Sequence, residues 1–440
     1  MEWYWALSLL IGCLIAFMAV GMPVVFAFFA VDIIGAFIFM RGEIGILQFV
    51  RNSVDSLQVF ALMPIPMFVF MGEMLLHSGV ASRAIGAVDV LIARLPGRLS
   101  LVAIAGGTFF SSLSGSSIAN TAMLGSTLLP DMYKRGYRPD IAIGPIVAVG
   151  GIAILIPPSA LGVLLGSLAQ ISISKLLVAA IIPALIMAVL FFGYVMLRCT
   201  LQPEIAPGYE VQKLSLMERL KPFVIYVVPL LMIFLMVVCS ILFGLATPTE
   251  SASVGAVATV VACVLYRSFS WPVFIEAVRE TVKISVMTLF IIAGSVTFSQ
   301  ILAFSGASSG LSALVLEGDL GPLTIIIGML VILFFLGCFM DQVSMMLITI
   351  PLYMPIVGQL GFDPVWFGVL MLIVLEISLA TPPFGLLLFV MKGVAPEGTT
   401  LEQIILSVLP FILLSILVVV MIIIWPSLAT FLPEMMERMR

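Results

Sequence analysis

Long apolar runs divided by short polar segments set the strongest limit on what this chain can fold into. An α-helix needs roughly 20 apolar residues to cross a bilayer core of about 30 Å. Runs near that length recur along the chain, for example Leu176–Leu197, Phe223–Phe243 and Ile404–Phe431. Charged residues make up only 10% of the 440 residues, whereas soluble domains carry about a quarter. The sequence therefore predicts an all-α polytopic membrane protein embedded in a lipid bilayer.

The remaining composition excludes several other classes of protein. A net charge of −4 does not suit a nucleic-acid binder, so no nucleic-acid partner is expected. The only histidine, His77, cannot form a metal site alone, and the five cysteines stand singly as small hydrophobes. The apolar stretch Trp3–Met40 far exceeds the core of a signal peptide. It predicts a retained membrane anchor, which Gly21-Met22-Pro23 can break.

One apolar run, Leu99–Leu129, carries many hydroxyl groups at its centre. Its segment Ser111–Thr121 contains serines, a threonine, a glycine and an asparagine, where a lipid-facing helix would be apolar. Lipid cannot satisfy freed backbone N–H and C=O groups, so such a segment is tolerated only where unwound backbone lines a protein cavity. We therefore predict a re-entrant helical hairpin with its tip near the middle of the membrane.

The same pattern of prolines and glycines recurs 225 residues later. Each half then consists of a polar-tipped hairpin, a Gly-x-x-Pro turn, a helix, a Pro-Pro break and a further half-helix. Matching broken segments in two halves indicate the binding site of a secondary transporter, although prolines and glycines can also coincide by chance. The aligned residues are Pro130 with Pro355, Gly136 with Gly361, Pro139 with Pro364, and Pro157-Pro158 with Pro382-Pro383.

Loop charges predict that the two halves have opposite orientations in the membrane. The first Gly-x-x-Pro turn is flanked by Lys134, Arg135 and Arg138, whereas the corresponding segment Gln359–Asp363 contains no lysine or arginine. By the positive-inside rule the first turn faces the cytoplasm and the second faces away from it. The sequence thus predicts two inverted structural repeats, each with a re-entrant hairpin and a Pro-Pro broken helix.

Four short motifs, each weak alone, are specific in combination. They are Ser114–Asn120, Ile156–Ser159, Ala246–Glu250 and Thr381–Pro383. With them the chain resembles, over essentially its whole length, the large membrane subunit (permease, DctM-type) of TRAP transporters, a branch of the ion-transporter superfamily. The resemblance implies an elevator-type importer that is not an enzyme, carries a small organic acid and uses Na⁺ as the coupling ion, with no other cofactor.

The resemblance also implies partners, a location and a division into domains. The expected partners are a small four-helix membrane subunit, here a separate polypeptide, and a periplasmic solute-binding protein, all at the bacterial inner membrane. The acid carried stays open. The expected parts are scaffold helices and an amphipathic helix in 1–98, a first transport repeat in 99–200 with its hairpin in 99–130, a polar linker in 201–222, further scaffold helices in 223–321, a second transport repeat in 322–403 with its hairpin in 323–357, and a C-terminal helix in 404–440.

The first hairpin has the oxygens that a Na⁺ ion requires. An unwound tip offers backbone carbonyls together with hydroxyls, and a proline leaves carbonyls nearby without donors. The alternative is that small residues here only allow close packing of helices. The predicted ligands are Ser114, Gly115, Ser116 and Asn120, with carbonyls near Pro157.

Asp341 is the sharpest single prediction, because the repeat aligns it with Ser116. An ionisable group inside a membrane span costs at least about 2.5 kcal/mol and by default marks an ion path. A second Na⁺ site is expected in the hairpin segment from Gly337 to Ser344, shared with Thr381 and the carbonyls around Pro382. Capping of a half-helix by Asp341 is the alternative, and both roles can coexist.

An anionic substrate is expected at the same place, because half-helix N-termini attract carboxylates. The predicted substrate-binding residues are Ser116, Ser117, Ser159, Asp341 and Thr381.

Other polar residues have simpler interpretations. Thr247 to Glu250 predicts a capping box with proline in the first turn. Glu73 and Glu376 are expected as buried hydrogen-bonding partners, with a supporting role for Glu376 near Thr381. The role of Asp32 stays undecided.

Three other functions are alternatives to this one. A stand-alone Na⁺/carboxylate symporter of the same superfamily would need no partner proteins. An intramembrane aspartyl protease needs two aspartates, and Asp341 has no obvious mate. A channel would normally close a ring of subunits, whereas two half-sites in one chain favour alternating access.

Overall fold

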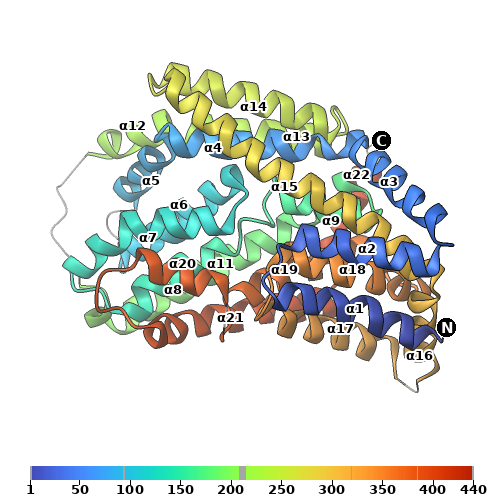
Figure 1. Cartoon of the computed structure of the whole chain (residues 1–440). Coiled ribbons are helices and arrows are strands. Elements are labelled where there is room, and N and C mark those ends of the chain that lie inside the picture. The colour runs from blue at the N-terminus through green and yellow to red at the C-terminus, as the bar shows by residue number, and fades with distance from the viewer. Residues whose placement is uncertain (1, 93–94, 208–214, 319, 384, 439–440) are drawn as a thin grey trace.

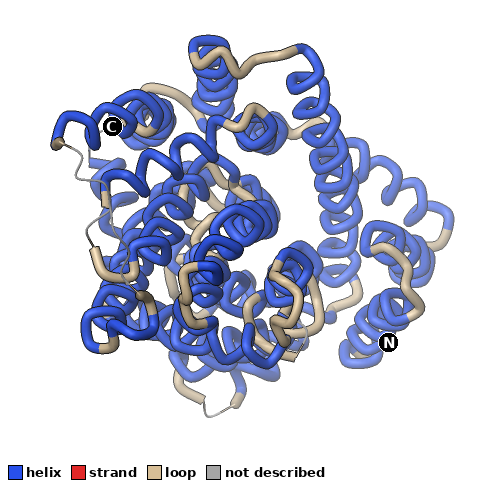
Figure 2. Tube along the Cα trace, turned by 90° about the vertical axis from the view of Figure 1, so that its left-hand side faces the viewer, coloured by secondary structure: helices blue, strands red, loops and turns tan. Residues whose placement is uncertain are grey.

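The computed structural model describes residues 2–92, 95–207, 215–318, 320–383 and 385–438. Within these residues the chain forms helices and no strands, as the colouring of Figure 2 shows. Most helices run across the view of Figure 1, and several are seen nearly end-on in Figure 2.

Helices of the first half follow one another with short connections. Gly21-Met22-Pro23 separates the first two, as the sequence predicts. The helices are α1 (Trp3–Ala19), α2 (Val24–Phe39), α3 (Glu43–Leu57), α4 (Pro64–His77), α5 (Val80–Leu91), α6 (Arg98–Ser114), α7 (Ser117–Lys134), α8 (Pro139–Gly150), α9 (Ala160–Leu168), α10 (Ile173–Ala179) and α11 (Ile181–Leu201), with a 3-10 turn at Phe60–Leu62.

The second half contains the longest helix of the described chain, α15. A 3-10 turn at Pro203–Ile205 precedes the first helix of this half, α12. The helices are α12 (Leu216–Tyr226), α13 (Val228–Leu242), α14 (Pro248–Leu265), α15 (Trp271–Phe304), α16 (Ala307–Glu317), α17 (Pro322–Gly337), α18 (Gln342–Gln359), α19 (Pro364–Leu379), α20 (Leu386–Val394), α21 (Leu401–Ile424) and α22 (Ser427–Arg438).

Six helical segments in the described residues are long and apolar enough to cross a membrane, which confirms the prediction of a polytopic membrane protein. The pair α12 and α13, bent by 44°, would make a seventh. The six are Phe60–His77, Ile173–Leu201, Pro248–Leu265, Trp271–Phe304, Gln342–Gln359 and Leu401–Ile424.

Helix boundaries in the two halves recur at the offset that aligns their prolines. α7 and α18 begin at Ser117 and Gln342 and end at Lys134 and Gln359, 225 residues apart at both ends. α8 and α19 both begin at the proline of the Gly-x-x-Pro turn. Helix breaks follow at 151–159 and, in the described residues after α19, at 380–383 and 385.

The two helices that follow the hairpins lie in the interior. Every residue of 141–150 in α8 and of 365–379 in α19 is buried. A helix that is apolar all round is stable only when other elements surround it. α8 packs against α6, α7 and α21, and α19 packs against α17, α18 and α21.

Two of the expected segments contain helix ends that the sequence patterns did not predict. α12 begins at Leu216, inside the segment expected to be a linker, because Ser215 and Glu218 form a capping box that starts a helix there. The expected single C-terminal helix is two helices, α21 and α22, because Pro426 cannot continue α21. The predicted capping box of Thr247 and Glu250 is confirmed at the start of α14.

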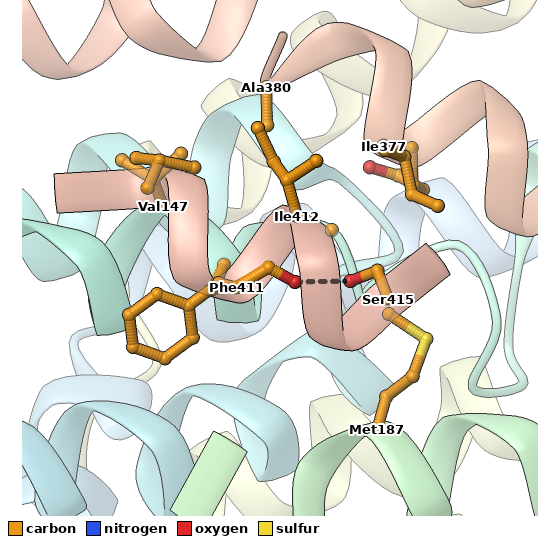
Figure 3. A pocket seen from close by; sticks show the side chains of 11 residues that line it. Val147, Met187, Ile377, Ala380, Phe411, Ile412 and Ser415 are labelled. Carbon is orange, nitrogen blue, oxygen red and sulfur yellow. Dashed lines mark hydrogen bonds between the residues drawn. The ribbon is translucent and has the colours of Figure 1, made fainter. Parts of the chain in front are cut away.

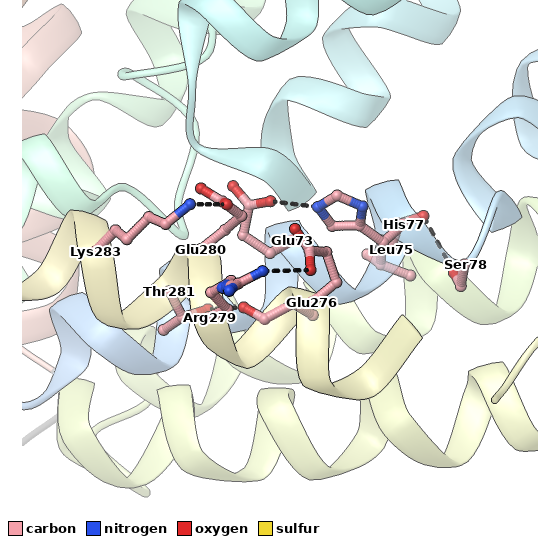
Figure 4. Close-up of polar contacts among 10 residues, drawn as sticks. Glu73, Leu75, His77, Ser78, Glu276, Arg279, Glu280, Thr281 and Lys283 are labelled. Carbon is pink, nitrogen blue, oxygen red and sulfur yellow. Dashed lines mark hydrogen bonds and ion pairs between the residues drawn. The ribbon is translucent and has the colours of Figure 1, made fainter. Parts of the chain in front are cut away.

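The only histidine of the sequence, His77, has a carboxylate partner in a polar cluster between α4 and α15 (Figure 4). His77 Nε2 lies 3.3 Å from Glu73 Oε2, one helical turn away on α4. On α15, Lys283 pairs with Glu280 beside them. Glu73 is therefore a half-buried polar partner of His77.

Gly144 tests the packing of α8 against α21. A Cβ added to Gly144 would overlap the Ser407 carbonyl oxygen and lie 2.6 Å from the Phe411 ring, whereas one added to Gly193 in α11 meets nothing within 4 Å. We expect Gly144→Ala to destabilise the protein by about 1–3 kcal/mol through overpacking. Gly193→Ala should melt at or above the wild-type temperature, because alanine favours helix by about 1 kcal/mol. Thermal unfolding in detergent checks this, and equal melting of the two variants would contradict it.

Candidate functional site

The first hairpin turns at Gly115, between α6 and α7. Gly115 adopts a left-handed conformation with φ of 59°, which glycine tolerates better than other residues. Ser116 then caps α7, because its hydroxyl accepts a hydrogen bond from the Ala119 N–H at 3.3 Å. The side chain of Ser114, a predicted cation ligand, lies outside the described part of the structure.

The hairpin tip lies against the break that follows α8. A Cβ added to Gly115 would be only 3.0 Å from the Pro158 carbonyl oxygen, so glycine permits this close approach. Pro157 and Pro158 are buried, and the bond between them is cis. Ser159, fully buried, caps α9 by accepting from the Gly162 N–H at 2.9 Å. The structure thus brings together Gly115, Ser116, Pro157 and Ser159.

Asn120 lies fully buried where α6, α7 and α8 meet. Its Nδ2 donates to Ser111 Oγ and, at 3.4 Å each, to the carbonyl oxygens of Gly107 and Val149. The Oδ1 atom accepts no hydrogen bond from the described residues, and neither does the buried Thr121 Oγ1 beside it in α7. These two buried oxygens therefore lack a hydrogen bond from the described residues. Ser111 and Val149 were not among the predicted site residues.

The second hairpin turns between Gly337 and Asp341. Asp341 Oδ2 accepts hydrogen bonds from the N–H groups of Val343 at 3.0 Å and Ser344 at 3.2 Å, and the Ser344 hydroxyl donates to Oδ1. Asp341 therefore caps α18, which was the alternative interpretation. Asp341 is exposed on the chain, whereas the cap of α9, Ser159, is fully buried. Cation binding by Asp341 stays a prediction.

The break after α19 gathers backbone oxygens. A Cβ added to Gly385 would lie 2.6 Å from the Thr381 carbonyl oxygen and 2.7 Å from that of Leu379. The Thr381 hydroxyl donates back to the Ile377 carbonyl at 2.7 Å, in the last turn of α19. Pro382 follows, joined to Pro383 by a cis bond. Neutral carbonyl oxygens in such unwound segments are typical ligands of Na⁺.

Gly337 lies against α19 just before this break. A Cβ added to Gly337 would overlap the side chain of Ser378, so the close packing of α17 on α19 needs a glycine at this position. The Ser378 hydroxyl donates to the Leu375 carbonyl at 2.8 Å. The second hairpin and the second break are therefore neighbours, as the first hairpin and first break are.

Glu376 connects the two hairpins. Its Oε1 accepts hydrogen bonds from Ser117 Oγ at 2.6 Å and from Gln342 Nε2 at 2.9 Å. The sequence indicated a buried hydrogen-bonding role for Glu376, but neither partner was anticipated. The one available signal was the 225-residue offset, which aligns Ser117 with Gln342.

Two cavities lie near these elements. A small one of about 20 Å³ lies beside Glu376, between α8, α19 and α21; its walls include Val147, Met187 and Phe411 (Figure 3). A cleft of about 720 Å³ opens between α3, α9 and α15. Its polar walls include Asn52, Ser167, Gln170, Ser295 and Ser299.

The site is built from oxygen atoms. Among the described residues no group of three or more His, Cys, Asp or Glu side chains could hold a metal ion. Asp32 lies elsewhere, fully buried in α2, with both carboxylate oxygens unpartnered among the described residues. What the hairpins and breaks offer is hydroxyl, amide and carbonyl oxygens, with the Asp341 carboxylate at one tip.

Comparison with known proteins identifies the family of this arrangement. Residues 11–428 match the family model described as the DctM component of tripartite ATP-independent periplasmic transporters. The chain is 29% identical over 408 residues to the C4-dicarboxylate TRAP transporter large permease protein DctM of Pseudomonas aeruginosa, covering 90% of this chain and 93% of that protein. It is 28% identical to the sialic acid TRAP transporter large permease protein SiaM of Vibrio cholerae, covering 94% and 95%.

A solved structure shares the fold. The YdaH transporter of Alcanivorax borkumensis superposes with a TM-score of 0.62 at 14% identity, covering 86% of this chain and 87% of that one. At this identity the likeness concerns the fold alone.

Asn120 gives a test of how the first hairpin is held. Asn120→Ala would leave Ser111 Oγ and two carbonyl oxygens without this donor in a buried place, so we expect a loss of about 1–3 kcal/mol of stability. Ser126→Ala is the control, because Ser126 is exposed on the same helix. Thermal unfolding in detergent should show a clear fall for Asn120→Ala only. Equal melting temperatures would mean that Asn120 does not hold α6 and α8 together.

Proposed function

Because the chain belongs to the family of DctM components of tripartite ATP-independent periplasmic transporters, we propose that it imports a small organic acid by Na⁺ symport. Large permeases of this family work with a small membrane subunit and a periplasmic binding protein. In this proposal the small subunit is a separate four-helix polypeptide, and the complex lies in the bacterial inner membrane. The binding protein delivers the acid.

The convergence of two hairpin tips and two helix breaks is the observation that supports Na⁺ coupling. Gly115 lies on the Pro158 carbonyl, Gly337 lies on α19 just before the second break, and Glu376 bonds to both hairpins. Neutral oxygens at such breaks suit a weakly held monovalent cation. Asn120 Oδ1, buried and without a hydrogen bond from the described residues, would serve the first ion, and Asp341 with the carbonyl of Thr381 would serve the second.

The substrate would bind beside the cations. The hydroxyl of Ser159 accepts its capping bond, so it keeps a proton to donate to a carboxylate. Ser116 stays a predicted substrate-binding residue at the neighbouring tip. The N-termini of α7, α9 and α18 add exposed N–H groups and a favourable dipole. The relatives named above are a C4-dicarboxylate and a sialic acid permease, and both substrates are carboxylic acids. A cation beside an anion stabilises it, and this attraction would couple uptake to the Na⁺ gradient.

Matching helix boundaries support an inverted repeat and an elevator motion. The boundaries of α7 and α18 keep one offset, while the basic residues of the turn after α7 have no counterpart after α18. The 720 Å³ cleft lies between α3 and α15, assigned to the scaffold, and α9, assigned to the transport domain. In the proposed mechanism these two parts slide past one another along this cleft.

Reconstitution in liposomes tests the proposal. A thermal-shift screen of the purified binding protein, with succinate, malate and sialic acid in the panel, would select the acid to be radiolabelled. We expect the acid to accumulate only with an inward Na⁺ gradient and with both the binding protein and the small subunit present. Uptake that persists when choline replaces Na⁺ would contradict Na⁺ symport. Uptake without the binding protein would favour a stand-alone symporter.

Asp341→Asn tests the second cation site separately from folding. Asparagine is as good a helix cap as aspartate, so the variant should fold and insert normally. Loss of the carboxylate should raise the half-saturating Na⁺ concentration about tenfold, equivalent to about 1.4 kcal/mol, or abolish uptake. Na⁺ titration of uptake measures this. Asp363→Asn is the control, because Asp363 caps α19 in the same way but lies in the turn after α18. An unchanged Na⁺ dependence in Asp341→Asn would remove Asp341 from the site.

A further inference from the structure

We propose that Glu376 is a positioning residue that holds the two hairpin tips at a fixed separation, so that the two cation sites act as one. The proposal rests on the Na⁺ symport function above and adds to it a residue that touches neither ion. It concerns the bridge Ser117–Glu376–Gln342, defined by the two hydrogen bonds to Glu376 Oε1.

The environment of Glu376 explains why such a bridge is needed. Glu376 is only 2% exposed, and a buried carboxylate is costly unless hydrogen bonds or an ion pair compensate for the loss of water. None of the ion pairs among the described residues includes Glu376. Its compensation comes from Ser117 and Gln342, so the carboxylate and the two tips depend on each other.

Both donors occupy the same position in their hairpins. Ser117 is the first residue of α7 and Gln342 is the first residue of α18, each directly after a cap. Those caps, Ser116 and Asp341, are predicted cation ligands. One oxygen atom of Glu376 therefore joins corresponding points of the two hairpins, one residue away from each predicted site. A shift of either tip on binding Na⁺ would stretch a hydrogen bond to the other tip.

In the first half of the chain, a glycine at the aligned position leaves room for the Glu376 side chain. The residue aligned with Glu376 is Gly151, and a Cβ added there would lie 3.5 Å from Glu376 Oε2 and 3.7 Å from Glu376 Cβ. The pair is therefore asymmetric, with the side chain of one half reaching across to the backbone of the other. Oε2 takes no hydrogen bond from the described residues, so the bridge uses one oxygen only.

Because one oxygen makes both bonds, position and charge can be separated by substitution. Glutamine has the same length and keeps a carbonyl oxygen that can accept from both donors. Glu376→Gln should therefore rescue what Glu376→Ala loses. If the negative charge itself were used, the two variants would be equally impaired.

Na⁺ binding to the purified full-length chain gives the first measurement. NaCl replaces KCl at constant ionic strength, and the Na⁺-dependent rise in melting temperature yields a half-saturating concentration and a Hill coefficient. In Glu376→Ala we expect the half-saturating concentration to rise at least about fivefold and the Hill coefficient to fall towards one. Glu376→Gln should stay within about twofold of wild type. The double variant Ser117→Ala with Gln342→Ala should match Glu376→Ala.

A control variant separates this effect from general destabilisation. Thr349, buried in α18, donates only to the Met345 carbonyl of its own helix at 2.7 Å. Thr349→Val should lower the melting temperature at every Na⁺ concentration without changing the half-saturating concentration. The same pattern in Glu376→Ala would overturn the proposal, because it would indicate a purely structural role.

A distance measurement tests the bridge independently of Na⁺. Spin labels at two exposed positions, Ile118 on α7 and Phe335 on α17, in a background without native cysteines, report the separation of the hairpins. We expect a narrow distribution in wild type and Glu376→Gln and a broad one in Glu376→Ala. Identical distributions in all three would overturn the proposal. A wild-type chain that shows no response to Na⁺ but the expected distances would instead contradict the proposed symport function.

Discussion

The structure depends on one constraint, that a backbone freed from helical hydrogen bonds inside a membrane must find partners within the protein. Four such interruptions in the described chain lie at Gly115, at 151–159, at 338–341 and at 380–383. Three are followed by a capping side chain, Ser116, Ser159 or Asp341, which satisfies N–H groups at the start of the next helix. All four lie close to the buried helices α8 and α19. The surrounding helices therefore separate the unwound backbone from lipid.

Much of this was predictable from local sequence signals. The apolar runs predicted a helical membrane protein, and the dense hydroxyls of Ser111–Thr121 located a hairpin whose tip the structure places at Gly115. The paired prolines located both later breaks, because the signal lies in the break itself, where two successive prolines remove two backbone N–H donors. The capping box at Thr247 was recognisable for the same reason. Each of these signals spans only a few residues, so it can be recognised without knowledge of the tertiary fold.

Contacts between distant segments were not predictable in the same way. The hydrogen bond between Ser117 and Glu376 joins residues 259 positions apart. The residues next to them in the sequence give no sign of this contact. The exposure of Asp341 depends on which helices surround the second tip, which an apolar sequence run does not reveal. The start of α12 was not predicted, because Ser215 and Glu218 lie in the polar segment 201–222, all of which was assigned to a linker.

The burial of α8 and α19 on every side has a mechanical consequence. A helix that touches lipid on one face can slip past its neighbours by exchanging acyl chains, whereas a fully wrapped helix can shift alone only by breaking close-packed contacts. Each of these two helices is followed by one of the two Pro-Pro breaks. Any displacement of the breaks should therefore move the helices packed around α8 and α19 with them, as one rigid body.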